Sequence, residues 1–306
     1  MSTKPSLPME DKSRDGPTDL MKMSDYDPEQ NKYNQTHEAQ EEKTRYLDKV
    51  IKKGLTREES EQVLLILLFR NFNFFLTFVL VRTISPPKFR KKIFQVSTLE
   101  ALDLLYNRLL QGFLPQFPPN GSLHTLVLSN TNFSGTLPDS IGNPKMLSRI
   151  KLPGYNFKGL ISNTMANLTQ LVYLDLSSNL FTSTIPSFQM SKNITCIDLS
   201  YNSLTGHVTS AHFQGLSNLL NIDLAHNSFN GGIHLSFFSL PLLQKIQISN
   251  NQFDGPVIGF SNESLPSLDT LDLSRNKLQG SIPSSFFELR SLNVLSLFFN
   301  NFSGII

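Results

Sequence analysis

The chain contains the side chains that catalytic and metal sites use, but their spacing matches no such site. Its 306 residues include six histidines and one cysteine, with no P-loop, no G-x-G-x-x-G and no protein-kinase signature. His207 and His212 are five residues apart across an expected loop, which is not the spacing of a metal motif. We therefore expect no enzyme, no catalytic residue, no metal site and no cofactor.

Aspartate is the chemically active residue type that recurs at a regular spacing. Because residues alternate between the two faces of a strand, an Asp between two core leucines should face outward. Stacked coils would then place Asp175, Asp198 and Asp223 in one row, with neighbours about 5 Å apart. The row could bind a cation or a basic ligand, but a solvated strand face needs no ligand and is the interpretation we prefer. The recurring positions are Asp103, Asp175, Asp198, Asp223 and Asp272.

These aspartates belong to a repeated sequence motif, here called the line. Its clearest copy is LDTLDLSRNKLQGSIP at residues 268–283. The line aligns nine times at intervals of 23 to 25 residues, which is typical of a solenoid of stacked coils. Between the asparagine and glycine positions lies an apolar site, filled by Phe133, Phe157, Phe181, Phe229, Phe253 and Phe302. The asparagine position falls at Asn107, Thr131, Tyr155, Asn179, Asn202, Asn227, Asn251, Asn276 and Asn300.

Each position of the line has a physical role. L-x-x-L-x-L predicts a short strand with a buried face, and stacking the coils side by side makes a parallel sheet over a continuous core. The asparagine amide can both donate to and accept from backbone groups that the following turn leaves unpaired. Thr131 can do part of this, whereas Tyr155 is too large, so its coil should be irregular. We expect the phenylalanines to stack as an aromatic spine.

A binding surface is expected on the outward side of the strands, where side chains that depart from the common pattern are the best candidates. Arg149, Lys151 and Tyr173 should cluster on adjacent strands. Phe298 and Phe299 replace small residues, and they form either a binding patch or a contact with a further coil. The predicted ligand-binding residues are Arg149, Lys151, Tyr173, Tyr201, His226, Lys245, Gln247, Arg275 and Phe298.

Charge and cysteine content limit the classes of partner. The net charge of +2 divides into +3 for residues 1–92 (17 basic, 14 acidic) and −1 for residues 93–306 (10 basic, 11 acidic). The array therefore has no basic face, and we expect no nucleic-acid partner. Cys196 is the single cysteine, so no intrachain disulfide can form and cysteine usage does not indicate the compartment.

The N-terminal third has a different composition from the array. Residues 1–35 are polar and predict a disordered tail. Residues 36–83 predict helices, and 15 of the 19 residues in 63–81 are apolar, which suits a membrane span despite Arg70 near its centre. The alternative is a helix packed on the first coil, covering its open edge. Residues 84–92 form a basic linker, and Ile93–Val96 look like the tail of an earlier repeat whose strand is missing.

The L-x-G-x-I-P ending resembles the plant-specific leucine-rich repeat. The runs IFQVSTLEALDLLYNRLLQGFLPQFPPNGSLHTLVLSNTNFSGTLPDSIGN, MANLTQLVYLDLSSN and FSLPLLQKIQISNNQFDGPV are similar to the ectodomain of plant receptor-like proteins of the Verticillium wilt resistance type. The resemblance covers about residues 93–306. It implies an α/β leucine-rich-repeat solenoid with a parallel sheet on its concave face and repeats of about 24 residues. We expect an internal slice of such an ectodomain, truncated at both ends and joined to an unrelated N-terminal extension.

The resemblance also implies a role. We expect a non-catalytic receptor-like protein of plant defence or signalling, at the plasma membrane with the array outside the cell. It would bind a protein or peptide ligand and signal through a membrane receptor kinase or co-receptor. The alternatives are a soluble inhibitor of a microbial cell-wall hydrolase and a truncated product without independent activity. N-x-S/T sequons suggest glycosylation in the array at Asn120, Asn132, Asn167, Asn193, Asn262 and Asn301.

Overall fold

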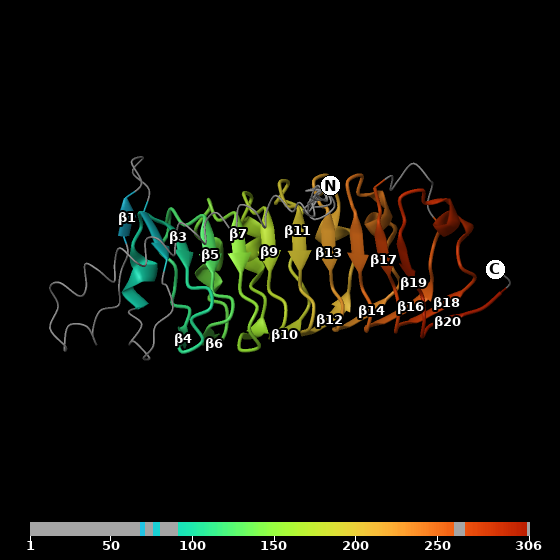
Figure 1. Ribbon diagram of the computed structural model, residues 1–306, viewed down its shortest axis with the longest axis horizontal. Helices are drawn as coiled ribbons and strands as arrows, with labels where there is room; N and C mark the ends of the chain where they lie inside the picture. The colour runs from blue at the N-terminus through green and yellow to red at the C-terminus, as the bar shows by residue number, and fades with distance from the viewer. Residues whose placement is uncertain (1–67, 71–75, 80–90, 260–266, 305–306) are drawn as a thin grey trace, which may run out of the picture. The chain divides into compact units, whose positions relative to one another are not determined.

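A computed structural model describes residues 68–70, 76–79, 91–259 and 267–304 (Figure 1). The chain divides into two compact units, Met1–Thr56 and Arg57–Ile306, and all described residues belong to the second. Short strands follow one another side by side along this unit, and each return segment carries the chain to the next strand. This confirms the predicted solenoid with a parallel sheet.

Among the described residues, the first strands of the coils form an 11-stranded sheet, here called the long sheet. Its order follows the sequence, and all its pairs from β2 onward are parallel. The strands are β1 (Leu68–Arg70), β2 (Leu76–Val79), β3 (Leu99–Asp103), β5 (Thr125–Val127), β7 (Arg149–Lys151), β9 (Tyr173–Asp175), β11 (Cys196–Asp198), β13 (Asn221–Asp223), β15 (Lys245–Gln247), β17 (Thr270–Asp272) and β19 (Val294–Ser296).

A second set of strands lines the opposite side of each coil. In the described part of the chain it comprises a two-stranded sheet and a seven-stranded sheet, all parallel. The first pair is β4 (Gln111–Phe113) and β6 (Asn132–Ser134). The larger sheet contains β8 (Lys158–Leu160), β10 (Leu180–Ser183), β12 (Ser203–His207), β14 (Ser228–Gly231), β16 (Gln252–Pro256), β18 (Lys277–Gly280) and β20 (Asn301–Phe302).

Short helical turns complete most coils where the chain returns to the long sheet. Pro138 and Pro283 stand at the N-caps of η3 and η6, positions where a missing N–H donor costs nothing. The turns are η2 (Lys91–Gln95), η3 (Asp139–Gly142), η4 (Asn163–Asn167), α3 (Ser210–Phe213), η5 (Leu235–Ser239) and η6 (Ser284–Glu288). No described helix combines the length and the hydrophobicity that a membrane crossing requires.

One hydrophobic core runs through the coils. Each long-sheet strand from β3 to β17 has a core residue, from Leu102 to Leu271, that is at most 1% exposed, whereas the residues on either side of it are mostly half-buried. The predicted aromatic spine forms in two sections: Phe157 stacks on Phe181 at 6.5 Å, and Phe229 stacks on Phe253 at 6.2 Å. Leu204 takes the aromatic position between these sections, so the stacking is interrupted there.

Asparagine side chains join neighbouring coils, as the repeat predicts. Asn202 Nδ2 donates to the carbonyl of Leu176 in the preceding coil at 3.0 Å and to Leu199 in its own coil at 3.1 Å. Its Oδ1 accepts from the backbone N–H of Phe181 at 3.0 Å. The same arrangement recurs at Asn179, Asn227, Asn251, Asn276 and Asn300.

The coil containing Tyr155 is irregular, as predicted. In the other coils the residue before the asparagine position has a positive φ, for example Ser178 at 53°, but here Tyr155 itself takes it at 66°. Its side chain is 69% exposed, so it does not replace the buried amide. Between β6 and β8 only an isolated bridge, Gly135 to Phe157, remains. The missing asparagine therefore coincides with the break in the second layer of strands.

The structure has strands, and not the predicted helix, in the described residues of 63–81. Leu68–Arg70 and Leu76–Val79 are strands, paired antiparallel with each other, and β2 pairs parallel with β3. Short apolar runs do not distinguish a buried strand from a helix by periodicity, and the free edge of β3 offers unpaired backbone groups to a strand. Thus β2 occupies the place of the strand that the sequence suggested was missing. Of the predicted linker 84–92, only residues 91 and 92 are described, and they belong to η2. The remainder of the predicted segments 1–35, 36–83 and 84–92 lies outside the described residues.

Candidate functional site

The outer face of the long sheet presents two parallel rows of side chains, set by the strand register. The first row contains Arg149, Tyr173 and Cys196 in consecutive strands. The second contains Lys151 followed by the carboxylates of the next three strands, Asp175, Asp198 and Asp223. Main-chain hydrogen bonds hold this order, so the arrangement of charge along the face is a property of the fold.

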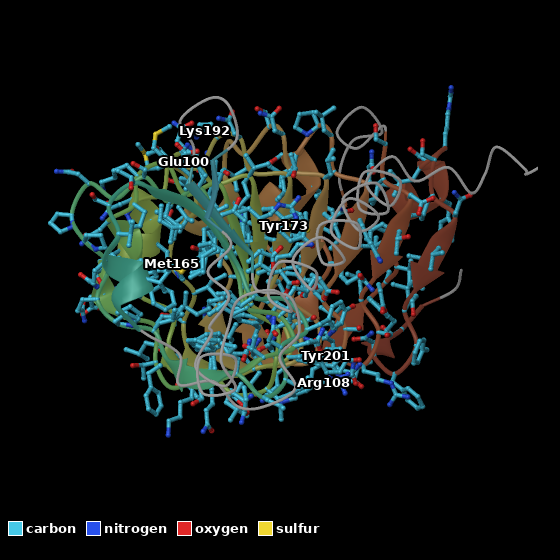
Figure 2. All side chains as sticks on the ribbon, turned by 60° about the vertical axis from the view of Figure 1, so that its left-hand side comes forward. Glu100, Arg108, Met165, Tyr173, Lys192 and Tyr201 are labelled. Carbon is cyan, nitrogen blue, oxygen red and sulfur yellow. The ribbon has the colours of Figure 1, made fainter. Side chains whose placement is uncertain are left out.

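Arg149, Lys151 and Tyr173 form the cluster that the sequence predicts. The Arg149 guanidinium carbon lies 4.7 Å from the centre of the Tyr173 ring, and Lys151 Nζ lies 4.6 Å from it. All three side chains are half-buried, and Tyr173 can be located on the sheet in Figure 2. Burial raises the pKa of Tyr173, and the thiol of Cys196 and the carboxylates of Asp175 and Asp198 raise it further. The ring therefore stays neutral and holds two cations, an arrangement suited to an anionic partner.

The predicted row of aspartates exists, and each member accepts a hydrogen bond from the backbone of the turn that follows its strand. Asp175 Oδ1 accepts from the N–H of Ser177 at 3.1 Å and from its hydroxyl at 2.7 Å, and Asp198 binds Ser200 in the same way. The carboxylates are half-buried, which differs from the solvated strand face that we preferred. Burial raises the pKa of Asp175 despite the hydrogen bonds from Ser177. The row thus has a structural role before any role in binding.

Asp223 differs from Asp175 and Asp198 in having no hydroxyl hydrogen bond from its turn. Its Oδ1 accepts from the N–H of Ala225 at 2.9 Å, and no hydroxyl is present at that position. Burial, with a contribution from Asp198, raises its pKa to about 6. At Asp272 burial also acts to raise the pKa, but hydrogen bonds from Ser274 and other serines outweigh it, and the pKa is lowered. An alanine two positions after the aspartate is the sequence signal for this difference, and sequence reasoning missed it.

Cys196 lies in the first row beside Tyr173, and it is half-buried. Burial is the main cause that raises the pKa of its thiol to about 11, and Asp198 adds to it. At neutral pH the side chain is therefore a protonated thiol, which is a poor nucleophile.

Several predicted ligand-binding residues lie beside the sheet rather than on it. Lys245 and Gln247 are in β15, as expected. Tyr201, His226 and Arg275 instead occupy the turn after a strand, with φ of 54° to 56°. A position with positive φ there turns the chain away from the sheet, so these side chains line its rim. They were predicted to extend the surface formed by the strands, and in the structure they lie in the turns that follow the strands.

Rim side chains of neighbouring coils contact one another. Tyr201 stacks on His226 with ring centres 4.0 Å apart. Arg275 lies over Phe298 at 5.4 Å and over Phe299 at 4.7 Å, and these rings are 53% and 70% exposed. The rim thus carries polar and aromatic side chains that contact one another between neighbouring coils.

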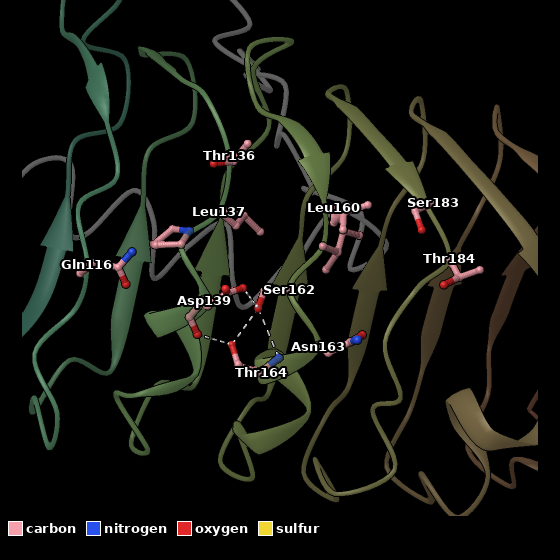
Figure 3. A pocket seen from close by; sticks show the side chains of 12 residues that line it. Gln116, Thr136, Leu137, Asp139, Leu160, Ser162, Asn163, Thr164, Ser183 and Thr184 are labelled. Carbon is pink, nitrogen blue, oxygen red and sulfur yellow. Dashed lines mark hydrogen bonds between the residues drawn. The ribbon is translucent and has the colours of Figure 1, made fainter.

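A groove of about 520 Å³ lies on the side of the second set of strands (Figure 3). Ser162 Oγ donates to Asp139 Oδ1 at 3.0 Å and lies 2.9 Å from the Thr164 hydroxyl. These bonds join η3 to η4, which accounts for the polar side chains at its base. The lining residues are Gln116, Thr136, Leu137, Pro138, Asp139, Leu160, Ile161, Ser162, Asn163, Thr164, Ser183 and Thr184.

The histidines and the sequons can also be placed. His212 caps α3 with Thr209, and His207 packs over Gly231, so the two serve different local structures. In the described part of the chain no group of His, Cys, Asp or Glu could hold a metal ion. The described sequon asparagines are all exposed and lie off the long sheet, whereas Asn262 is outside the described residues; they are Asn120, Asn132, Asn167, Asn193 and Asn301.

Comparison with known families agrees with the repeat structure. Models described as leucine rich repeat match residues 259–302, 122–144 and 170–190. Among curated proteins of Arabidopsis thaliana, receptor-like protein 6 is 43% identical over 65 residues, which is 21% of this chain and 6% of the relative. Receptor-like protein 39 is 32% identical over 122 residues, covering 39% and 14%. The chain therefore spans only a small part of these relatives.

Solved structures show the same fold. The Arabidopsis receptor kinase HAESA, in complex with the peptide hormone IDA and the co-receptor SERK1, matches with a TM-score of 0.64 and 30% identity, over 71% of this chain and 40% of that one. PEPR1–AtPEP1 matches with a TM-score of 0.62 and 30% identity, over 71% and 34%. The narrower resemblance to the Verticillium wilt resistance type stays a prediction. In sequence and fold, the array is a leucine-rich-repeat array similar to those of plant receptor-like proteins and receptor kinases.

Proposed function

We propose that the array is a non-catalytic, receptor-like recognition module that binds a peptide or protein segment on the outer face of the long sheet. The observation that carries the proposal is the cluster of Arg149, Lys151 and Tyr173, which displays two cations and an aromatic ring on adjacent strands. Charged and aromatic side chains of this kind are the residues that anchor interfaces.

The similar proteins support this choice of ligand class. HAESA binds the peptide hormone IDA with the co-receptor SERK1, and the receptor RGFR1 is found in complex with RGF2. By extension, this chain would recognise its ligand together with a membrane receptor kinase or co-receptor. We place it in plant defence or signalling, at the plasma membrane, with the array outside the cell.

The test uses the full chain and a phage-displayed library of random dodecapeptides. Peptides are selected on the immobilised protein and then measured against a variant carrying Arg149→Ala, Lys151→Ala and Tyr173→Ala. We expect this variant to lose binding by at least about tenfold, since each substitution removes a contact group from one patch. Its circular dichroism spectrum should remain native because all three side chains lie on the outer face.

A matched variant controls for general loss of surface charge. Lys158→Ala, Leu180→Ala and Lys277→Ala remove two cations and an apolar side chain from exposed positions of the second set of strands. This variant should bind as the wild type does. Equal binding by both triple variants, with native spectra, would end the proposal.

A further inference from the structure

On the outer face of the long sheet, the charge of the side chains changes sign between the adjacent strands β7 and β9. Lys151 in β7 pairs in register with Asp175 in β9, and the same row continues through Asp198 and Asp223. One cationic strand is therefore followed by three anionic ones. Because adjacent strands are about 4.8 Å apart, the centres of the two charges lie roughly 10 to 14 Å from each other.

The cationic end is organised before any ligand arrives. Arg149 and Lys151 both rest against the ring of Tyr173, at 4.7 and 4.6 Å, although long cationic side chains normally sample many rotamers. Ordering them in the free protein lowers the entropy lost when an anionic group binds. The Tyr173 ring therefore makes the position between β7 and β9 a preferred binding site for an acidic group.

At the anionic end, Asp223 has fewer hydrogen bonds from its own turn than Asp198 has. It accepts one hydrogen bond from Ala225, whereas Asp198 accepts two from Ser200. The charged groups that act on Asp223 are Asp198 and Asp272, which raise its pKa, and Lys245, which lowers it. A basic group from a ligand would offset the desolvation that holds this carboxyl at a pKa of about 6.

We propose that the face takes an extended peptide in one charge order, with an acidic group on Arg149 and Lys151 and a basic side chain over Asp198 and Asp223. The inference rests on the function proposed above and specifies its ligand. An extended chain advances about 3.3 Å per residue, so the two ligand charges should be three or four residues apart. A second acidic residue over the aspartates would be repelled, so the row also excludes wrong ligands.

The test compares the composition of peptides selected on three full-length proteins. These are the wild type, the variant Arg149→Gln/Lys151→Gln and the variant Asp198→Asn/Asp223→Asn. Peptides selected on the wild type should be enriched in Asp or Glu three or four positions from Lys or Arg. The Gln variant should lose the preference for the acid, and the Asn variant should lose the preference for the base.

Selected peptides are then synthesised with either charge neutralised. Removing the basic residue should weaken binding to the wild type about tenfold and leave binding to the Asn variant unchanged. Removing the acidic residue should have the corresponding effect with the Gln variant only. Asparagine keeps the size of aspartate, glutamine keeps a polar side chain without the charge, and circular dichroism checks that both variants fold.

Proton linkage supplies an independent readout. As pH falls from 7.5 to 5, Asp223 takes up a proton, since its pKa is about 6, and the contribution of the peptide base should decline. The Asn variant should show a smaller decline over the same range. A peptide whose binding depends on its base yet has the same pH profile on both proteins would argue against the assignment to Asp223.

Two outcomes separate this inference from the proposed function. Peptides that lose binding to the Arg149→Ala/Lys151→Ala/Tyr173→Ala variant, but show no paired acid and base, would overturn the charge order and leave the recognition face in place. Peptides whose binding no outer-face variant affects would overturn both.

Discussion

Asp223 differs from its neighbours because of the residue that lies two positions after it. Ser177, Ser200 and Ser274 each give a hydroxyl hydrogen bond of 2.7 Å to an aspartate of the long sheet, whereas Ala225 has no hydroxyl. Ser200 and Ser274 are buried as Ala225 is, at 2% to 5% exposure, so a hydroxyl fits the position.

We predict that Ala225→Ser stabilises the protein at neutral pH. A folded pKa of about 6, above the ordinary 3.8, means that the contribution of Asp223 is present below about pH 4 and is lost as pH rises through 6. A serine hydroxyl stabilises the carboxylate and lowers its pKa, so the gain should grow between pH 4 and pH 7 to about 1 kcal/mol. Urea unfolding at several pH values measures it; a gain that does not change with pH would contradict the reasoning.

Tyr155 is a second residue whose effect on the fold the sequence predicts only in part. Its size predicts that it would not replace the buried asparagine, and the irregular coil confirms this. The pattern did not reveal that the positive φ moves onto Tyr155 itself, because the local conformation depends on how the coil fits between its two neighbours.

At the scale of elements, the asparagine side chains are what connect one coil to the next beyond the core. From the coil of Asn179 onward, each one satisfies carbonyl groups of two coils and an N–H of the preceding coil, as Asn202 does. In the coils of Thr131 and Tyr155 this connection is incomplete: Thr131 donates only to Leu128 of its own coil, at 2.7 Å. The first three coils are therefore held together more by the core than by such side-chain bonds.

We predict that Asn202→Ala lowers the free energy of unfolding by about 3 kcal/mol. The substitution leaves the N–H of Phe181 and the carbonyl of Leu176 without this partner in the array interior, and each unmade buried bond costs about 1 to 3 kcal/mol. Asn221→Ala, on the outer face of β13, is the matched control and should change stability by less than about 0.5 kcal/mol. Similar losses for both variants in denaturant unfolding would contradict the proposed coupling between coils.

The sequence predicts the strands of the array correctly, but it predicts a helix at 63–81, where the structure has strands. In the repeats, alternating leucines and regular turn residues specify strands, and strands are found at each of the nine predicted lines. The run at 63–81 has no such alternation, so its apolar content suited a helix equally well. Pairing with the edge of β3 is a tertiary interaction, and it is what distinguishes β2 from a helix.

At the scale of the whole molecule, the positions of the sequons bear on where the array functions. The described sequon asparagines are exposed and none is in the long sheet, so glycans on them would leave the recognition face uncovered; they are Asn120, Asn132, Asn167, Asn193 and Asn301. This arrangement is what a secreted or cell-surface recognition module needs.

We predict that the chain expressed in plant cells carries several N-linked glycans and is recovered with membranes through the receptor kinase or co-receptor proposed above. Endoglycosidase treatment of separate membrane and soluble fractions should lower the mass of the membrane-associated chain by several glycans. Replacing Asn167 and Asn193 with Gln should remove two glycans without changing the fold, because both side chains are exposed. A chain with no mass shift in either fraction would contradict the extracellular placement and favour a truncated product.

The sequence by itself determined the solenoid, the number of lines in the array, the buried and outward positions, and the cluster around Tyr173. It could do so because each coil repeats the same short-range pattern, so the register between coils follows from counting residues. Only the tertiary structure decided that Tyr201, His226 and Arg275 lie on a rim and that β2 extends the long sheet. It also decided that Asp223 is held at a raised pKa. The rim and the added strand depend on neighbours about 24 residues away or beyond the repeat, and the burial that raises the pKa of Asp223 comes from the packed coils, although Ala225 marks the position in the sequence.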